Sequence, residues 1–240
     1  MSTVHGTAIV HPEARLDPSV EVGPYAVIEG DTTIGARNRI FQFASVGAEP
    51  QDLKYAGEAS RLEIGDENLI REFTTLHIGT AGGGAVTRIG NRNLFMAYSH
   101  VAHDCQIGSG CVLANSAALA GHVEVGDHVI LGGLSAVHQF TRIGRHAFIA
   151  GGAMVGLDVP PYCTAQGDRA ELVGLNTVGL TRHGFTDEQV ARVKDAYRIL
   201  FRSKLGLNEA LSKVKAEHGG HAEIDQLVAF LEGSKRGVTR

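Results

Sequence analysis

The chain has 240 residues and a mass of 25.4 kDa, and 43% of the residues are hydrophobic and 20% are charged. This composition can build a buried core, so a disordered chain is excluded. The net charge of −4 excludes a strongly basic nucleic-acid-binding protein, and no apolar run approaches the ~18 residues of a membrane-spanning helix. The N-terminus lacks the basic and apolar regions of a signal peptide, and three cysteines at no metal-ligand spacing indicate a reducing compartment. We therefore expect a cytoplasmic protein.

Branched aliphatic residues recur every six positions through the first two thirds of the chain. A period of six fits neither an ordinary helix nor an ordinary strand, but it is typical of a parallel β-helix in which three hexads make one 18-residue coil of a triangular prism. Known members of this architecture wind left-handedly. The series consists of Val4, Val10, Leu16, Val22, Ile28, Ile34, Ile40, Val46, then Ile64, Ile70, Leu76, then Ile89, Phe95, Val101, Ile107, Leu113, Leu119, Val125, Leu131, Val137, Ile143, Ile149 and Val155.

Glycine often follows the aliphatic residue of a hexad. Gly90, Gly108, Gly126 and Gly144 recur every 18 residues, which supports the coil length independently of the aliphatic series. We expect these glycines to adopt the turn dihedrals that a residue with a Cβ would resist at the corners of the prism.

The predicted fold is an all-β left-handed parallel β-helix over residues 1–161, followed by a connector and a C-terminal α-helical domain over 162–240. Two polar or glycine-rich segments, 48–62 and 79–87, interrupt the prism as loops. Thr186 and Gln189 have the spacing of a capping box and predict the start of a helix. Asn208 is expected to cap a second helix, and residues 224–231 suggest a third.

The coil length places several histidines on one edge of the prism. Counted from the start of each coil, His77, His103, His122 and His138 occupy nearly the same angular position, and His100 lies on the adjoining stretch. Chance placement on the surface is one interpretation. The functional interpretations are a metal site shared between subunits and a general base beside substrate-binding groups. Spacing alone does not separate these alternatives.

Three features favour the general base. The first loop supplies Asp52 and Lys54, which suit a polar, phosphate-bearing substrate. Asp104 follows His103 and could orient its imidazole, although neighbouring residues of a strand point to opposite sides. Gly121 lies one coil above His103, where its backbone N–H could stabilise an oxyanion. The other interpretation of Gly121 is a simple turn residue.

Several strings resemble the bacterial UDP-N-acetylglucosamine acyltransferase family, whose enzyme performs the first step of lipid A synthesis. They are QFASVGAEPQDLKYAGE (42–58), HVAHDC (100–105), AGHVEV (120–125), VHQF (137–140), VPPY (159–162), AQGD (165–168) and NTVGLTRHGF (176–185). The resemblance covers nearly the whole chain. It implies transfer of an R-3-hydroxyacyl group from acyl carrier protein to the 3-hydroxyl of UDP-N-acetylglucosamine.

The resemblance also implies roles for particular residues. His103 matches the catalytic base, and Gly121 matches the oxyanion donor. Gly151 and Arg169 match positions near the end of the acyl groove, and a glycine at 151 implies an open groove and a longer acyl chain. The residues that match the substrate pocket are Asp52, Lys54, His100, His122, His138, Gln139, Asn176 and Arg182.

The family is a homotrimer with active sites between subunits, and no metal or dissociable cofactor is implied. Acyl carrier protein and UDP-N-acetylglucosamine are the expected partners. Three alternatives remain at this point: a metal-dependent hydratase of the γ-carbonic anhydrase type, a non-catalytic binding protein, and the N-acyltransferase of the same pathway. That relative usually carries a separate N-terminal uridine-binding domain, whereas the hexads here begin at Val4.

Overall fold

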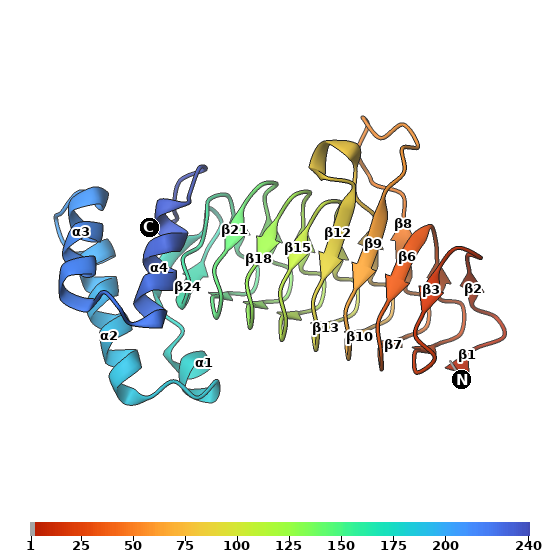
Figure 1. The fold of residues 1–240 in the computed structure, drawn as a ribbon, viewed down its shortest axis with the longest axis horizontal. Coiled ribbons are helices and arrows are strands. Elements are labelled where there is room, and N and C mark those ends of the chain that lie inside the picture. Colours follow the sequence, from red (N-terminus) through yellow and green to blue (C-terminus); the bar gives the residue numbers. More distant parts are fainter. Residues whose placement is uncertain (1–2) are drawn as a thin grey trace.

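A computed structural model describes residues 3–240 and has a β-prism followed by a helical end (Figure 1). Three parallel sheets form the faces of the prism, and from Thr3 to Val155 each successive strand of the chain belongs to the next face. Sheet A contains β1 (Thr3–Val4), β4 (Glu21–Val22), β7 (Arg39–Ile40), β10 (Leu69–Ile70), β13 (Leu94–Phe95), β16 (Val112–Leu113), β19 (Ile130–Leu131), β22 (Phe148–Ile149), β24 (Cys163–Gln166) and β25 (Glu171–Leu175). Sheet B contains β2 (Ile9–Val10), β5 (Val27–Ile28), β8 (Ser45–Ala48), β11 (Thr75–His77), β14 (His100–Val101), β17 (Ala118–Leu119), β20 (Ala136–Val137) and β23 (Met154–Val155). Sheet C contains β3 (Arg15–Leu16), β6 (Asp31–Ile34), β9 (Arg61–Ile64), β12 (Val86–Ile89), β15 (Gln106–Ile107), β18 (Glu124–Val125) and β21 (Arg142–Ile143).

The aliphatic series of the sequence forms the core of the prism. Every member from Val22 onward is buried, whereas Val4, Val10 and Leu16 in the first coil are not, because no coil covers them from below. Ile40 pairs with Ile70, although the chain between them contains the first loop. The first excursion therefore leaves and rejoins the prism without breaking its register, as the 18-residue spacing from Val46 to Ile64 predicts.

The hexad glycines are needed for a different reason from the one we expected. Left-handed dihedrals at the corners belong mostly to other residues, such as Tyr25 and Arg37, while Gly90 and Gly126 lie outside that region. A Cβ on Gly90 would lie 2.6 Å from the carbonyl oxygen of Gly108 in the next coil. Close stacking of successive coils, rather than turn geometry, excludes a side chain at these positions.

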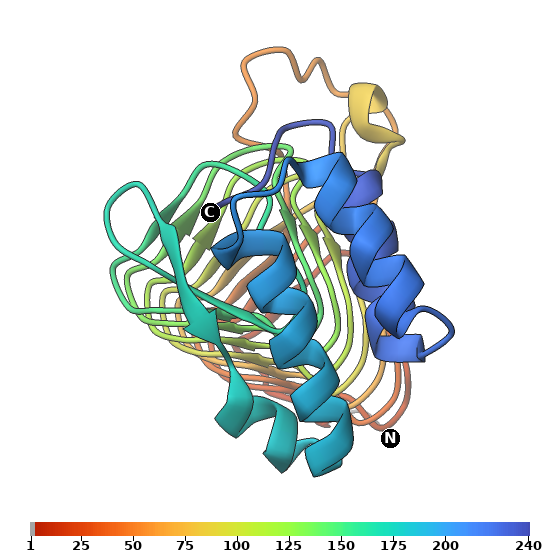
Figure 2. The same ribbon diagram turned by 90° about the vertical axis from the view of Figure 1, so that its left-hand side faces the viewer.

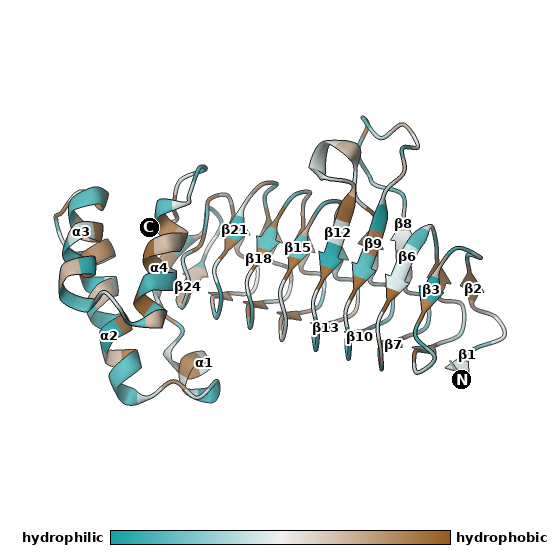
Figure 3. Cartoon of the chain, viewed as in Figure 1, coloured by the Kyte–Doolittle hydropathy of each residue, from teal (hydrophilic) through white to brown (hydrophobic). Residues whose placement is uncertain are grey.

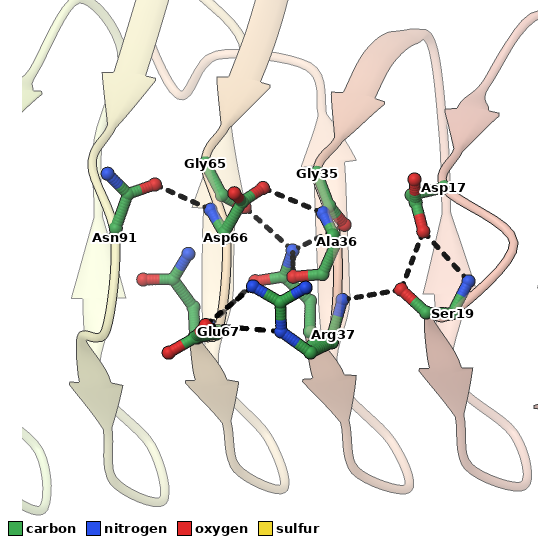
Figure 4. Close-up of polar contacts among 11 residues, drawn as sticks. Asp17, Ser19, Gly35, Ala36, Arg37, Gly65, Asp66, Glu67 and Asn91 are labelled. Carbon is green, nitrogen blue, oxygen red and sulfur yellow. Dashed lines mark hydrogen bonds and ion pairs between the residues drawn. The ribbon is translucent and has the colours of Figure 1, made fainter.

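Side chains satisfy the backbone at the corner between sheets C and A. The N–H of Ala36 donates to the Asp66 carboxylate at 2.7 Å, and the N–H of Asp66 donates to the Asn91 side chain at 2.7 Å (Figure 4). The same relation continues upward, because Asn91 N–H donates to Ser109 Oγ. Four successive turns at this corner, from Ala36 to Ser109, are thus closed by a polar side chain one coil further along.

Both excursions leave the prism at the corner between sheets B and C, which we call the B–C edge. The first covers 49–60, and the second contains a 3₁₀ helix, η1 (Ala81–Gly83), before β12. Residues 48, 61–62 and 86–87, which the sequence analysis placed in the loops, belong to strands. In Figure 1 both excursions project from the same side of the prism.

The C-terminal part begins as sheet and continues as helices. β24 extends sheet A and forms an antiparallel hairpin with β25, so the connector is partly β structure. The helices are α1 (Thr177–Arg182), α2 (Asp187–Tyr197), the π-helix η2 (Arg198–Arg202), α3 (Leu207–His218) and α4 (Ala222–Glu232). They cover one end of the prism (Figure 2) and each combines apolar and polar residues (Figure 3). Among residues 3–240, no helix is both long and apolar enough to cross a membrane.

The helix starts were partly predictable. Thr186 and Gln189 form the predicted capping box of α2, with both reciprocal hydrogen bonds present. The prediction for Asn208 is wrong, because the N-cap of α3 is Gly206, two residues earlier, and Asn208 lies inside the first turn. The helix predicted over 224–231 is α4.

Candidate active site

His103 and Asp104 form a buried hydrogen-bonded pair on the B–C edge. His103 Nδ1 lies 2.8 Å from Asp104 Oδ2, and the Asp104 side chain has no exposed surface. Asp104 lies in a turn with φ of 61°, not in a strand, and this backbone conformation directs its carboxylate back toward the preceding residue. The alternation of side chains along a strand therefore does not apply here, and Asp104 holds the imidazole.

The second excursion holds Asp104 in place. Thr80 donates its backbone N–H to Oδ1 at 2.9 Å and its hydroxyl to Oδ2 at 2.6 Å. Thr87 Oγ1 accepts the Asp104 backbone N–H at 2.8 Å. A Cβ on Gly83 would overlap the carboxylate, so the glycine-rich composition of this segment allows it to approach Asp104 closely. Neither Thr80 nor Thr87 was predicted as a site residue. Their position at the two ends of the glycine-rich segment was the one sequence feature that could have indicated their role.

Gly121 lies against the His103 ring. A Cβ at this position would be 2.6 Å from His103 Nε2, so the ring nitrogen that does not bind Asp104 faces the Gly121 backbone. Within residues 3–240, the Gly121 N–H has no hydrogen-bond acceptor. Four successive turn N–H groups at the corner between sheets C and A, beginning with that of Ala36, do have side-chain acceptors. The free N–H of Gly121 is thus available to a ligand next to an imidazole nitrogen.

His122 is in register with Asp104 and lies one coil above it. Its ring packs edge-on against His103 with centroids 5.0 Å apart and stacks on Phe140 at 4.4 Å. Burial lowers the pKa of His122, the Asp104 carboxylate opposes this shift, and His103 adds to it. The Asp52 carboxylate of the first excursion also opposes the shift, which places its charge near His122.

The remaining histidines of the predicted row occupy neighbouring positions. His100 Nδ1 lies 2.7 Å from Thr75 Oγ1, and its ring packs edge-on against that of His77. His77 is buried, and burial lowers its pKa to about 4. His138 is exposed in the coil above Gly121 and is followed by exposed Gln139. The row of histidines predicted from the coil length is therefore present, but only His103 has a carboxylate partner within hydrogen-bond distance among residues 3–240.

A cavity of about 920 Å³ runs along the B–C edge. It is bounded by the second excursion, by Asp104 and His122, and by the C-terminal residues Lys235 and Arg236. Lys54 is exposed on the first excursion. The basic residues Lys235 and Arg236 were not predicted, because nothing in the local sequence places the C-terminus beside His122.

An apolar groove of about 410 Å³ lies further along sheet B. Its walls include Val137, Met154 and Leu157, and Arg169 lies at its border together with His138. Gly151 does not line this groove; it is exposed at the turn between sheets A and B. Of the two residues predicted to affect acyl length, only Arg169 borders this groove in one chain.

Asn176 and Arg182 lie away from the B–C edge. Asn176 caps α1 by accepting the Gly179 N–H at 3.0 Å and donates to the His146 carbonyl at 3.0 Å, which places it at the corner between sheets C and A. Arg182 is exposed at the end of α1. Within a single chain, Asn176 and Arg182 therefore lie away from His103.

A second histidine cluster occupies this other corner. The rings of His128, His146 and His183 lie within 5.1 Å of one another, and His146 is buried. Burial, reinforced by His128, Arg145 and His183, lowers the pKa of His146 to about 4.

Two other chemistries can be compared with this geometry. His103, Asp104 and His122 offer ligand atoms within 4.8 Å of one another, which could hold a metal ion. However, both oxygens of Asp104 already accept hydrogen bonds, one of them from His103 Nδ1, so these atoms are already engaged within the protein.

Cysteine nucleophiles do not fit the site either, because Cys105 and Cys111 are buried and burial raises the pKa of each thiol to about 12.

Comparisons with known proteins identify the family. A family model described as UDP-N-acetylglucosamine O-acyltransferase, domain 2, matches residues 158–239, and a bacterial transferase hexapeptide model matches residues 87–121. The acyl-[acyl-carrier-protein]–UDP-N-acetylglucosamine O-acyltransferase of Myxococcus xanthus is 63% identical over 258 positions, with all of both chains covered. The chain belongs to the UDP-N-acetylglucosamine O-acyltransferase family. It is therefore an acyltransferase.

Solved structures of the same family agree with the fold. The UDP-N-acetylglucosamine O-acyltransferase from Moraxella catarrhalis is 40% identical with a TM-score of 0.91, covering 99% of this chain and all of that one. The acyltransferase from Arabidopsis is 33% identical with a TM-score of 0.85, again covering 99% and 100%. The predicted left-handed parallel β-helix with a C-terminal helical region is confirmed.

Proposed function

We propose that this acyltransferase moves an R-3-hydroxyacyl chain from acyl carrier protein to the 3-hydroxyl of UDP-N-acetylglucosamine, the first step of lipid A synthesis. The names of the relatives supply the donor and the acceptor. The observation that carries the mechanism is the arrangement at the B–C edge: Asp104 holds His103 Nδ1, and Gly121, whose N–H has no acceptor among residues 3–240, lies against the His103 ring.

In this mechanism His103 is the general base. Its Nε2 takes the proton of the sugar hydroxyl while the oxygen attacks the thioester carbonyl, because an alcohol is a poor nucleophile near neutral pH. Asp104 keeps the proton of the neutral ring on Nδ1 and stabilises the imidazolium that forms. The Gly121 N–H donates to the oxyanion of the tetrahedral intermediate. When the intermediate collapses, the thiolate leaves and takes the proton back from Nε2.

The substrate-binding roles of the other residues follow from the resemblance. Asp52, His122 and the Lys54 ammonium group surround the sugar nucleotide at the B–C edge, with His100, His138 and Gln139 along the same row. The apolar groove beside His138 suits an acyl chain, and Arg169 borders it. We propose that Gly151 contributes to acyl length from the neighbouring turn, and that no metal or dissociable cofactor takes part.

We further propose that the active enzyme is a homotrimer. Asn176 and Arg182 reach the nucleotide only if a second copy presents its corner between sheets C and A to the B–C edge of the first. Sedimentation should give about three times the 25.4 kDa chain mass.

The decisive experiment is acyl transfer by the His103→Ala variant. We expect turnover to fall by roughly 10³-fold or more with the fold intact, because general base catalysis is lost together with the group that returns the proton. Turnover near that of the wild type would rule out His103 as the base. Metal analysis of the purified protein tests the hydratase alternative, which requires stoichiometric zinc that is lost in the His103 and His122 variants.

A further inference from the structure

The last eight residues form a strap along the B–C edge. This C-terminal strap, residues 233–240, lies on the same side of the prism as the two excursions in both views (Figures 1 and 2). Buried Asp158 fixes it: the Asp158 N–H donates to the Gly237 carbonyl at 3.0 Å, and Thr239 N–H donates to the Asp158 carbonyl at 2.8 Å. The Asp158 carboxylate also accepts the Ser234 hydroxyl at 2.8 Å. These hydrogen bonds hold the strap in place as part of the cavity wall.

The strap points one guanidinium at His138. Arg236 Nε donates to the Gly156 carbonyl at 2.8 Å, which orients the side chain, and Arg236 Nη2 lies 2.8 Å from His138 Nδ1. Within residues 3–240, no carboxylate lies within ion-pair distance of Arg236. Its partners are a carbonyl and an imidazole, in a cavity that also contains His122.

Two groups compete for the same nitrogen of His138. The Gln139 carbonyl lies 3.1 Å from Nδ1 and can only accept a hydrogen bond, whereas Arg236 can only donate one. Both cannot be satisfied together, because Nδ1 carries either a proton or a lone pair. The contact with Arg236 is shorter and is assisted by a full positive charge, so it outweighs the neutral carbonyl. Nδ1 is then the acceptor, and the proton of the neutral ring is on Nε2.

We propose that Arg236 is a positioning residue that fixes His138 in the Nε2-protonated tautomer, so that His138 presents an N–H donor to an oxygen of the bound substrate. The hydrogen bond from His138 to the substrate rests on the proposed function, in which His138 contacts the substrate; the tautomer does not. Without Arg236, the Gln139 carbonyl attracts the proton to Nδ1. Nε2 then faces the substrate with a lone pair and repels the same oxygen.

The tautomer can be measured directly by NMR on the full-length protein labelled with ¹⁵N-histidine. Long-range ¹H–¹⁵N correlation distinguishes protonated from bare ring nitrogens, and the His138→Gln variant assigns the signal. We expect a protonated Nε2 in the wild type, a protonated Nδ1 in Arg236→Ala, and no change in Arg240→Ala, which alters the same strap at an exposed position. The same tautomer in the wild type and Arg236→Ala would overturn the proposal.

Kinetics test whether His138 donates a hydrogen bond to the substrate. We expect Arg236→Ala to lower kcat/KM by roughly tenfold, the effect of one hydrogen bond. Arg236→Lys should restore much of the loss, and Arg236→Ala should add nothing in a His138→Ala background. An equal tenfold loss in both backgrounds would show that Arg236 acts through the strap and not through His138. A wild-type protein that transfers no acyl group would refute the proposed function, while the NMR result would still decide the tautomer.

Discussion

Replacing Gly121 by alanine tests the contact on which the proposed chemistry depends. The new Cβ would lie 2.5 Å from His103 Cε1 and 2.6 Å from Nε2, whereas ordinary contacts begin near 3.4 Å. The imidazole must therefore retreat by about 1 Å from the oxyanion position. A displacement of that size costs roughly 100-fold in rate, or about 2.7 kcal/mol in the activation barrier. The Gly121 backbone is outside the left-handed region, so alanine causes no backbone strain there.

The assay is steady-state acyl transfer, combined with a thermal unfolding midpoint. We expect kcat to fall by roughly 100-fold in Gly121→Ala with little change in the midpoint, because the ring can move toward the open cavity. Gly6→Ala is the matched control, since a Cβ at Gly6 has no neighbour within 4 Å. A Gly121→Ala enzyme with a kcat within threefold of the wild type would refute the reasoning, because it would mean that the reacting atoms do not lie between His103 and Gly121.

Three further predictions follow from other contacts. Thr80→Val removes the hydroxyl donor to Asp104, and we expect kcat to fall by roughly tenfold in the transfer assay, with an unchanged rate arguing against a role for that contact. His146→Phe should make the protein less sensitive to acid. Because the pKa of His146 is lowered to about 4 in the folded protein, the unfolded chain binds more protons than the folded one between pH 6.5 and 4. Acidification to pH 5 should therefore lower the unfolding free energy of the wild type by about 2 kcal/mol. The variant lacks this imidazole and should keep that free energy, as measured by urea titration. Gly151→Met should shorten the preferred acyl chain, as measured by mass spectrometry of products from mixed acyl donors; an unchanged product spectrum would exclude Gly151 from a role in acyl length.

The sequence predicted the fold because the prism is periodic. A six-residue spacing of aliphatic residues determines which side chains face the axis, and the 18-residue coil places Gly121 directly above His103. The same arithmetic predicted the row of histidines on the B–C edge. It misjudged the hexad glycines, because their close approach to the next coil depends on packing between coils and not on the turn itself.

Residues outside the repeat could not be placed in this way. The orientation of Asp104 depends on a left-handed turn residue, which the alternation of a strand does not describe. Thr80 acts from an excursion of irregular length, and Arg236 reaches His138 across 98 residues of chain. Such contacts depend on where non-periodic segments return to the prism, and periodicity carries no information about that.

These segments also explain why the chemistry lies on one edge. Along the corner between sheets C and A, side chains one coil away accept hydrogen bonds from the turn N–H groups of Ala36, Asp66, Asn91 and Ser109. Along the B–C edge, Gly121 has no side chain above it to accept its N–H, and both excursions and the strap leave or rejoin the prism there. The excursion that carries Thr80 supplies the hydrogen bonds that Asp104 needs when buried. The prism therefore fixes the distance between base and oxyanion donor, and the irregular segments supply the polar partners that keep the base oriented.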